Sequence, residues 1–284
     1  MKKLVSLLFI FTMIFTLVSC DSPPETSYTG EKKSYTEKIK GDGTVEYRWY
    51  YRYDPNGEIS TSSRCNANGI CVQRETYTYN ESNDVLSKTI YISNEAGTAT
   101  KKASYTEYIY SDDGKLYMEK TNLPNEYKET IYEYNSEGNL SISTDYNAAG
   151  EIIGTKQYIY DSLKNLTNEN FYDGNENYLG GIISIYKDSK LTSKEYDGNQ
   201  ILEITETDAN GEIIKSHLIS KEDYFYDGDN VTKTYYYDTE GNRIYTETAE
   251  YDGDRCMHRM RVDANNAIIF TWNAYYDNFM SLIG

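Results

Sequence analysis

The chain has few of the residues that build a thick hydrophobic core or a catalytic centre. Its 284 residues include only 7 Phe, 2 Trp, 2 His, 4 Cys and 4 Pro, and its hydrophobic fraction of 38% includes 32 tyrosines. Without the tyrosines, about 76 apolar residues remain, roughly a quarter of the chain and less than a globular domain usually holds. This composition argues against a doubly wound α/β enzyme and against a large helical bundle.

Basic residues are also scarce, and no motif for chemistry is present. The 45 acidic residues outnumber 28 Lys and Arg, for a formal net charge of −17, which argues against a nucleic-acid partner because such partners need a basic face. His217 and His258 have no metal-ligand spacing around them. The chain has no GxSxG, P-loop or GxGxxG in its required context. We therefore predict no catalytic residue, no metal and no cofactor.

The first 20 residues look like a lipoprotein leader. A basic start at 1–3 precedes fifteen mostly apolar residues at 4–18, a stretch suited to a secretory signal and short for a membrane span of about 20. It ends in LVSC at 17–20, which resembles the lipobox of bacterial lipoproteins. The resemblance implies a signal peptide at 1–19 and acylation of Cys20. Two or three acyl chains would then anchor the protein stably to a lipid bilayer.

The likeness to lipoproteins places the protein in the bacterial cell envelope. The outer membrane or the cell surface is favoured, and the inner membrane stays open because Asp21 matches a retention signal of some Gram-negative bacteria. Residues 20–44 contain a Pro-Pro pair and no apolar periodicity, so we predict a flexible tether there. Residues 45–284 form the remaining unit, a tyrosine-rich repeat domain.

One strand-and-turn unit recurs along this domain. It is clearest in YRYDPNGEI at 51–59, YIYSDDGKL at 108–116, YEYNSEGNL at 132–140 and YYYDTEGNR at 235–243, and a shorter YDG form begins at 172, 196, 226 and 251. Most copies follow one another by about 11–14 residues, which fits one strand plus one turn. We predict an all-β fold, an extended antiparallel meander of about 16 short strands in a twisted or curled sheet or a partial barrel.

Turn chemistry supports this prediction. In DPNG at 54–57, the Asp side chain can accept backbone N–H groups, the Pro suits a type I turn, and the Gly suits a left-handed bulge. The Asp-Gly copies suit two-residue type I′ hairpins.

The aromatic residues alternate with polar ones along the predicted strands. Val45, Tyr47, Trp49, Tyr51 and Tyr53 share one face, opposite Glu46, Arg48, Tyr50 and Arg52, and Trp272 continues a similar pattern near the end. Tyrosine ladders can replace an aliphatic core, or exposed rings can form a binding surface, and both roles fit at different positions. The candidate binding aromatics are Tyr47, Trp49, Tyr51 and Trp272.

Two cysteines flank one predicted turn. A type I turn with a bulge makes Cys65 and Cys71 a facing pair, about 4.5–5.5 Å apart at Cα and within disulfide range. Because exported proteins often meet an oxidising compartment, we predict a disulfide; two reduced thiols are the alternative. The basic run RCMHRMR at 255–261 is interpreted as a surface strand that balances nearby carboxylates.

These repeats resemble the YD repeats of bacterial Rhs proteins and their teneurin relatives, in which Tyr-Asp strand ends and a following Gly recur. The resemblance implies a β-meander. It does not extend to a shell around a toxin, because the steps are shorter and Arg rarely follows the Gly.

The sequence therefore favours a non-enzymatic envelope lipoprotein whose β surface binds an unknown protein or glycan. One alternative is a structural or assembly role in which sheet edges pair with another envelope protein. Another is a hydrolase that acts on an extracellular polymer with a pair of carboxylates.

Overall fold

The computed structural model describes residues 31–207 and 213–278. Nineteen strands follow one another: β1 (Glu31–Lys40), β2 (Val45–Tyr53), β3 (Ile59–Asn66), β4 (Cys71–Tyr79), β5 (Val85–Ser93), β6 (Thr100–Tyr110), β7 (Leu116–Leu123), β8 (Glu126–Tyr134), β9 (Leu140–Asn147), β10 (Ile152–Tyr160), β11 (Leu166–Asp173), β12 (Tyr178–Lys187), β13 (Lys190–Tyr196), β14 (Leu202–Thr207), β15 (Ile213–Asp227), β16 (Asn230–Asp238), β17 (Arg243–Asp252), β18 (Arg255–Asp263) and β19 (Ile268–Asn278). A 3₁₀ turn, η1 (Gly198–Gln200), precedes β14.

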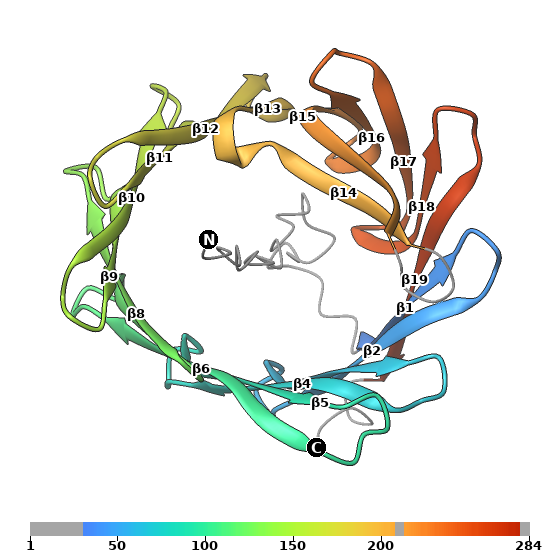
Figure 1. Ribbon diagram of the computed structural model, residues 1–284, viewed down its shortest axis with the longest axis horizontal. Coiled ribbons are helices and arrows are strands. Elements are labelled where there is room, and N and C mark those ends of the chain that lie inside the picture. Colours follow the sequence, from blue (N-terminus) through green and yellow to red (C-terminus); the bar gives the residue numbers. More distant parts are fainter. Residues whose placement is uncertain (1–30, 208–212, 279–284) are drawn as a thin grey trace, which may run out of the picture.

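The strands form an antiparallel meander that closes on itself. Apart from β13 and β14, each strand pairs with the next, and β19 returns to pair with β1, so that the sheet becomes a ring (Figure 1). β13 pairs directly with β15 through Ser193 to Glu195. Omitting β14 from the 19 strands therefore leaves 18 in the ring. The predicted all-β meander is confirmed, as a closed barrel with more strands than the expected 16 or so.

The predicted tether at 20–44 needs a correction, because β1 lies within it. β1 pairs with β2 and also with β19 at the other end of the chain, where Tyr35 faces Tyr275 and Lys38 faces Trp272. Its hydrogen-bond partners on β19 are therefore distant in sequence, and its alternating Lys, Thr and Glu residues show no apolar period. A strand between two neighbours needs no apolar period when both of its faces meet polar or aromatic side chains.

A single turn design connects most strands. The side-chain oxygen of the first residue accepts the N–H groups two and four positions later; for Asp54 these are Asn56 at 2.9 Å and Glu58 at 2.8 Å. The fourth residue takes a left-handed conformation, as at Gly57 with φ of 91°. Lys164 and Glu176 occupy the same position without glycine, at φ of 66° and 65°, where the surrounding hydrogen bonds hold a backbone that L-residues rarely adopt.

The Asp-Gly copies do not all form the two-residue hairpins expected for them. Asp227 faces Asn230 and Asp252 faces Arg255, which leaves two residues in each of these turns. At Asp173 the longer turn design appears instead, and Asp197 leads into η1. A type I′ turn has positive φ at both central residues, and this occurs at Asp188 and Ser189.

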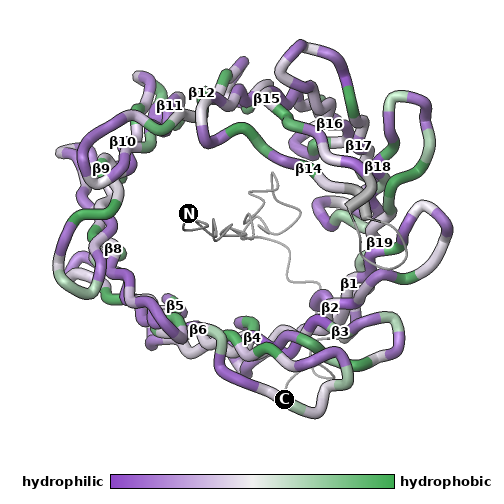
Figure 2. Tube along the Cα trace, viewed as in Figure 1, coloured by the Kyte–Doolittle hydropathy of each residue, from purple (hydrophilic) through white to green (hydrophobic). Residues whose placement is uncertain are grey.

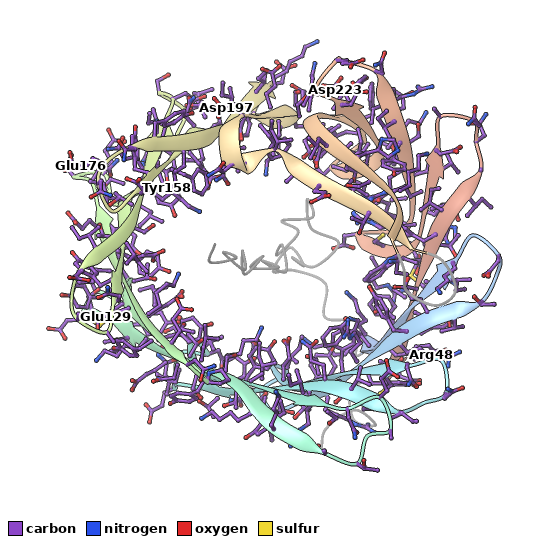
Figure 3. The ribbon with its side chains drawn as sticks, viewed as in Figure 1. Arg48, Glu129, Tyr158, Glu176, Asp197 and Asp223 are labelled. Atoms are coloured by element: carbon purple, nitrogen blue, oxygen red, sulfur yellow. A yellow bond between two sulfur atoms is a disulfide. The ribbon has the colours of Figure 1, made fainter. Side chains whose placement is uncertain are left out.

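The two faces of the ring differ in composition. Leu202 and Ile204 of β14 pack against Tyr236 and Tyr245, and β14 lies on the inner side of the ring in Figure 1. The face that carries Tyr236 and Tyr245 is therefore the inner face. Figure 3 agrees, with Tyr158 toward the centre and Arg48, Glu129 and Asp223 on the outer side.

Little of the ring forms a conventional core. The largest fully buried side chains include Ile219 and Tyr245, each 0% exposed, and they share one cluster with Leu202 and Ile204 of β14. Elsewhere, cations cover aromatic rings: Lys156 lies 4.5 Å from the ring centroid of Phe171, and Lys88 lies 5.6 Å from that of Tyr77. Figure 2 shows hydrophobic segments scattered among hydrophilic ones around the ring. Large rings with cationic partners thus stabilise a wall that has few aliphatic residues.

The last tyrosine of the repeat has a structural role at one rim of the ring. Alternate strands end there in Tyr, and its hydroxyl donates a hydrogen bond to a carbonyl at the start of the preceding strand in the ring. The bonds include Tyr79 to Ile59 at 2.8 Å, Tyr110 to Val85 at 3.0 Å, Tyr134 to Leu116 at 2.9 Å and Tyr251 to Val231 at 3.0 Å. Each tyrosine therefore ties two neighbouring strands together at the rim.

Candidate functional site

The four predicted binding aromatics come together on the inner face. Tyr47, Trp49 and Tyr51 alternate along β2, and the ring of Trp272 on β19 meets Tyr47 edge-on, with centroids 6.1 Å apart. We call these four residues the inner aromatic cluster. Lys38 and Arg64 each lie 5.7 Å from the Tyr47 centroid, and Lys33 lies 5.8 Å from that of Tyr51. The protein's own cations therefore cover several ring faces here, and a ligand role for the cluster stays a prediction.

Cys65 and Cys71 form a disulfide across the turn between β3 and β4. They face each other in the strand pairing, as the turn geometry predicts. The side chain of Asn66 accepts the N–H groups of Asn68 and Ile70 within this turn.

A second aromatic group lies on the outer face, where β1 pairs with β2 and β19. Tyr50 of β2 faces Tyr35 of β1, and Tyr35 faces Tyr275 of β19. The rings of Tyr35 and Tyr275 stack with centroids 4.3 Å apart and an angle of 12° between their planes, and Tyr50 lies 5.6 Å from Tyr35. Tyr50 is 40% exposed and Tyr275 is 37% exposed. We call these three residues the outer tyrosine platform.

A row of polar side chains runs beside the platform on the same face. Arg48, Glu37, Asn273 and His258 face one another in turn across β2, β1, β19 and β18. Glu37 accepts hydrogen bonds from Arg48 Nε at 3.2 Å and from the Tyr275 hydroxyl at 2.8 Å. Asn273 Oδ1 lies 2.7 Å from His258 Nδ1. We call these four residues the polar row.

The polar row shifts the acidity of its members. Burial acts to raise the pKa of Glu37, but hydrogen bonds from Tyr275, Asn273 and Arg48 outweigh it and hold that pKa below its ordinary value. The hydrogen bond to Glu37, together with burial, raises the pKa of Tyr275 to about 12. At neutral pH, Glu37 is thus a charged acceptor, and Tyr275 is a neutral phenol that donates to it.

In the basic run at 255–261, Arg255 pairs with the exposed Asp252, as expected, but Arg259 and Arg261 pair with a buried carboxylate on the inner face. Glu247 accepts from Arg261 Nη2 at 2.9 Å and lies 3.2 Å from Arg259 Nη1. Arg261 also donates to the Tyr236 hydroxyl at 3.1 Å. We call Glu247, Arg259, Arg261 and Tyr236 the buried ion network. A strand facing inward beneath a second layer explains why these charges are buried.

A further carboxylate lies close to this network. Glu222 accepts a hydrogen bond from the Tyr224 hydroxyl and faces Lys194 on β13. Burial raises the pKa of Glu222 against the attraction of Lys194 and Arg261.

An open groove lies in the outer face near the point where β13 and β15 separate. Its lining includes Ile183, Glu195, Asp197, Lys221, Asp223 and Tyr237. Asp197 accepts hydrogen bonds from the Gly181 N–H and, at 3.1 Å, from the Tyr178 hydroxyl, and Lys221 lies 3.3 Å from Asp223. Asp197 and Asp223 are therefore already engaged in contacts within the protein.

The histidines lie in separate places. His217 meets Tyr245 edge-on with centroids 5.5 Å apart, whereas His258 belongs to the polar row on the outer face. Among the residues that the structure describes, no three His, Cys, Asp or Glu side chains form a group able to hold a metal ion. Over the same residues, no helix is long and apolar enough to cross a membrane.

Sequence reasoning missed the outer tyrosine platform. It placed Tyr50 on the face opposite the inner aromatic cluster, which the structure bears out, but gave that face no role. Tyr35 lay in the predicted tether, and its contact with Tyr275 depends on closure of the ring. Only a prediction that the first and last strands pair would have joined these three residues.

Comparisons with known proteins identify no family. No family model matches the chain, and no curated protein matches it. Among solved structures, it is similar to a chain in the crystal structure of TcdB2-TccC3-Cdc42, with 13% sequence identity and a TM-score of 0.29. The similarity covers 84% of this chain, which spans about 15% of that longer chain.

Two porin-like proteins from Bacteroides are also similar. The protein from Bacteroides uniformis has 13% identity and a TM-score of 0.45, over 86% of this chain and 96% of its own. The protein from Bacteroides vulgatus has 13% identity and a TM-score of 0.29, over 86% and 98%. At these values the likeness carries no argument about function.

Proposed function

We propose that the protein is a lipid-anchored, non-enzymatic component of the bacterial envelope that binds a protein or glycan partner through its outer face. The observation that carries this proposal is the set of large apolar side chains exposed on that face. Tyr50, Ile183 and Phe225 are 40%, 46% and 45% exposed, at positions where the wall has no second layer. Exposed apolar groups of this kind commonly mark interaction sites.

Charged residues lie on both faces of the ring, which supports the interpretation that both faces contact water. On the outer face, Glu107, Lys120 and Glu129 face one another across β6, β7 and β8. On the inner face, Lys156 lies 3.6 Å from Glu169. A barrel embedded in a bilayer has an apolar outer band about 25 Å tall, and a charged residue at its midplane costs about 2–4 kcal/mol. A water-facing ring needs another attachment to a membrane, and the lipobox-like LVSC at 17–20 would supply it.

The anchor and the binding activity can be tested separately. Cys20 lies outside the described residues, and a Cys20→Ala variant should lose acyl labelling and membrane association. Continued incorporation of lipid would refute the anchor. For binding, the purified acylated chain is applied to a glycan array and used as bait in an envelope pull-down. A specific partner in either assay supports the proposal, and none in both assays contradicts it.

Closure of the ring weakens the alternative that the protein assembles by pairing of sheet edges, because few edges of the described strands stay unpaired. β19 pairs with β1, and in the described part of the chain both β14 and the part of β15 before Ile219 have an edge with no partner strand. An assembly role through edges would therefore depend on the hairpin of β14 and β15.

Hydrolysis would depend on the outer groove. Glu195 and Asp223 are diagonal neighbours there, and a glycosidase needs two neighbouring carboxyl groups of this kind. The ion pair of Asp223 with Lys221 and the open form of the groove favour binding over catalysis. Incubation with envelope polysaccharides should therefore release no new reducing ends.

A further inference from the structure

We propose that the outer tyrosine platform, with the polar row beside it, binds an uncharged glycan. This inference rests on the proposed function and specifies its ligand and its site. Three features of the molecule support it: the exposed aromatic surface, the hydrogen-bonding groups beside that surface, and the charge of the surroundings.

The aromatic surface of the platform is open to a ligand. Around the ring, many tyrosines have a cation over them, such as Arg74 at 4.9 Å from the Tyr91 centroid. Within the described part of the chain, no Lys or Arg lies over Tyr35, Tyr50 or Tyr275, which contact one another instead. On its other side Tyr50 faces the small side chain of Ser63, and Tyr50 is 40% exposed. The face of a sugar ring that carries C–H groups can pack there against the aromatic face.

The polar row provides both acceptors and donors next to this surface. Glu37, whose side chain is only 11% exposed, holds Arg48 and Asn273 in place. Arg48 offers a fork of N–H donors, and the Asn273 amide has both a donor and an acceptor group. These groups hold one another through hydrogen bonds of 2.8 to 3.4 Å. Their geometry is therefore set before a ligand arrives, which lowers the entropy cost of binding. Vicinal sugar hydroxyls both donate and accept, and they match such a row.

The charge of the site and of the whole chain determines which class of ligand fits. Within the polar row, Arg48 and Glu37 form an ion pair at 3.2 Å and so cancel each other's charge. The chain as a whole carries −17, which repels anionic polysaccharides at distances up to about a Debye length. The same net charge disfavours a second copy of this chain as the occupant. An uncharged hexose polymer or oligosaccharide fits these conditions.

The test compares the full acylated chain with two alanine variants on an array of neutral and acidic glycans. Tyr50→Ala should weaken binding to neutral glycans about tenfold, a loss equivalent to about 1.4 kcal/mol, because it removes the open ring. Tyr117→Ala is the matched control, since Tyr117 is 46% exposed but lies outside the platform; it should bind like the wild type. Tyr50→Phe should also retain binding, because the ring and not its hydroxyl forms the contact. Circular dichroism verifies that each variant is folded.

Several results would overturn the inference. These are binding only to acidic glycans, equal losses in Tyr50→Ala and Tyr117→Ala, or self-association in sedimentation that Tyr50→Ala abolishes. Specific capture of an envelope protein without glycan binding would also overturn it, yet would leave the proposed function standing. If neither a glycan nor a protein binds, both fail.

Discussion

The buried ion network gives the sharpest prediction about stability. Arg261 is 3% exposed and pairs with Glu247 at 2.9 Å, while Arg259 contacts the same carboxylate at 3.2 Å. Arg261→Met keeps an unbranched side chain of similar length but leaves Glu247 with one cation. Removing one partner of a buried pair lowers the free energy of unfolding by about 3–5 kcal/mol. Because Arg259 still contacts Glu247 in this variant, we expect a loss near ~3 kcal/mol. Glu247→Met should cost more, because it leaves two buried arginines without their carboxylate.

Urea unfolding followed by circular dichroism measures these losses. At about 2–4 °C per kcal/mol for a domain of this size, Arg261→Met should lower Tm by about 6–12 °C. The double variant should cost at least about 1 kcal/mol less than the sum of the two single variants, because the pair is in direct contact. A loss below about 1 kcal/mol for Arg261→Met, or strict additivity, would refute the assignment of Arg261 and Glu247 as a coupled pair beneath β14.

Three further predictions concern the rim, the disulfide and acid stability. Tyr79→Phe should lower the free energy of unfolding in urea by about 0.5–1.5 kcal/mol, because the Tyr79 hydroxyl donates to the Ile59 carbonyl. Tyr117→Phe is the control, and equal losses in the two variants would contradict a special role for the rim. The double variant Cys65→Ala/Cys71→Ala should lower the free energy of unfolding by about 2 kcal/mol, because the disulfide closes a short loop. Mass mapping of the wild-type chain without reductant should find the two cysteines joined, and free thiols at both positions would refute the disulfide. The pKa of Glu37 is lowered on folding, so its contribution to stability is present above its ordinary pKa of 4.5 and is lost as pH falls through the lower folded value. Tyr275→Phe removes one cause of that shift and should reduce the loss of urea stability between pH 6 and pH 3; an unchanged pH dependence would contradict this role.

Local sequence signals predicted the repeated part of the fold. Asp54 and Gly57 identified the turn design, because a side-chain acceptor and a residue with positive φ are needed at those positions. The alternation around Tyr47 and Arg48 identified the two faces of β2. Such features depend on residues a few positions apart, and an antiparallel meander needs little else.

What sequence reasoning could not supply depends on contacts between distant residues. The pairing of β1 with β19 closes the ring, and nothing in 31–40 indicates a partner so far along the chain. The same closure creates the outer tyrosine platform from Tyr35, Tyr50 and Tyr275. β14 is not part of the ring of strands and covers part of its inner face, which buries Arg261. From the sequence alone Arg261 is predicted to be a surface residue, because its strand is strongly polar.

The inner face, the outer tyrosine platform and the polar row all depend on closure of the ring, and a cross-link between β1 and β19 is a direct test of that closure. Thr36 of β1 faces Ala274 of β19, and facing residues in antiparallel strands lie within disulfide range. In a Thr36→Cys/Ala274→Cys variant, mild oxidation and peptide mapping should find the two new cysteines joined within one chain. The control pair Thr76→Cys/Thr89→Cys faces across β4 and β5, which any meander would contain. Cross-linking of the control without cross-linking of the seam would show that the sheet is open and would contradict the account.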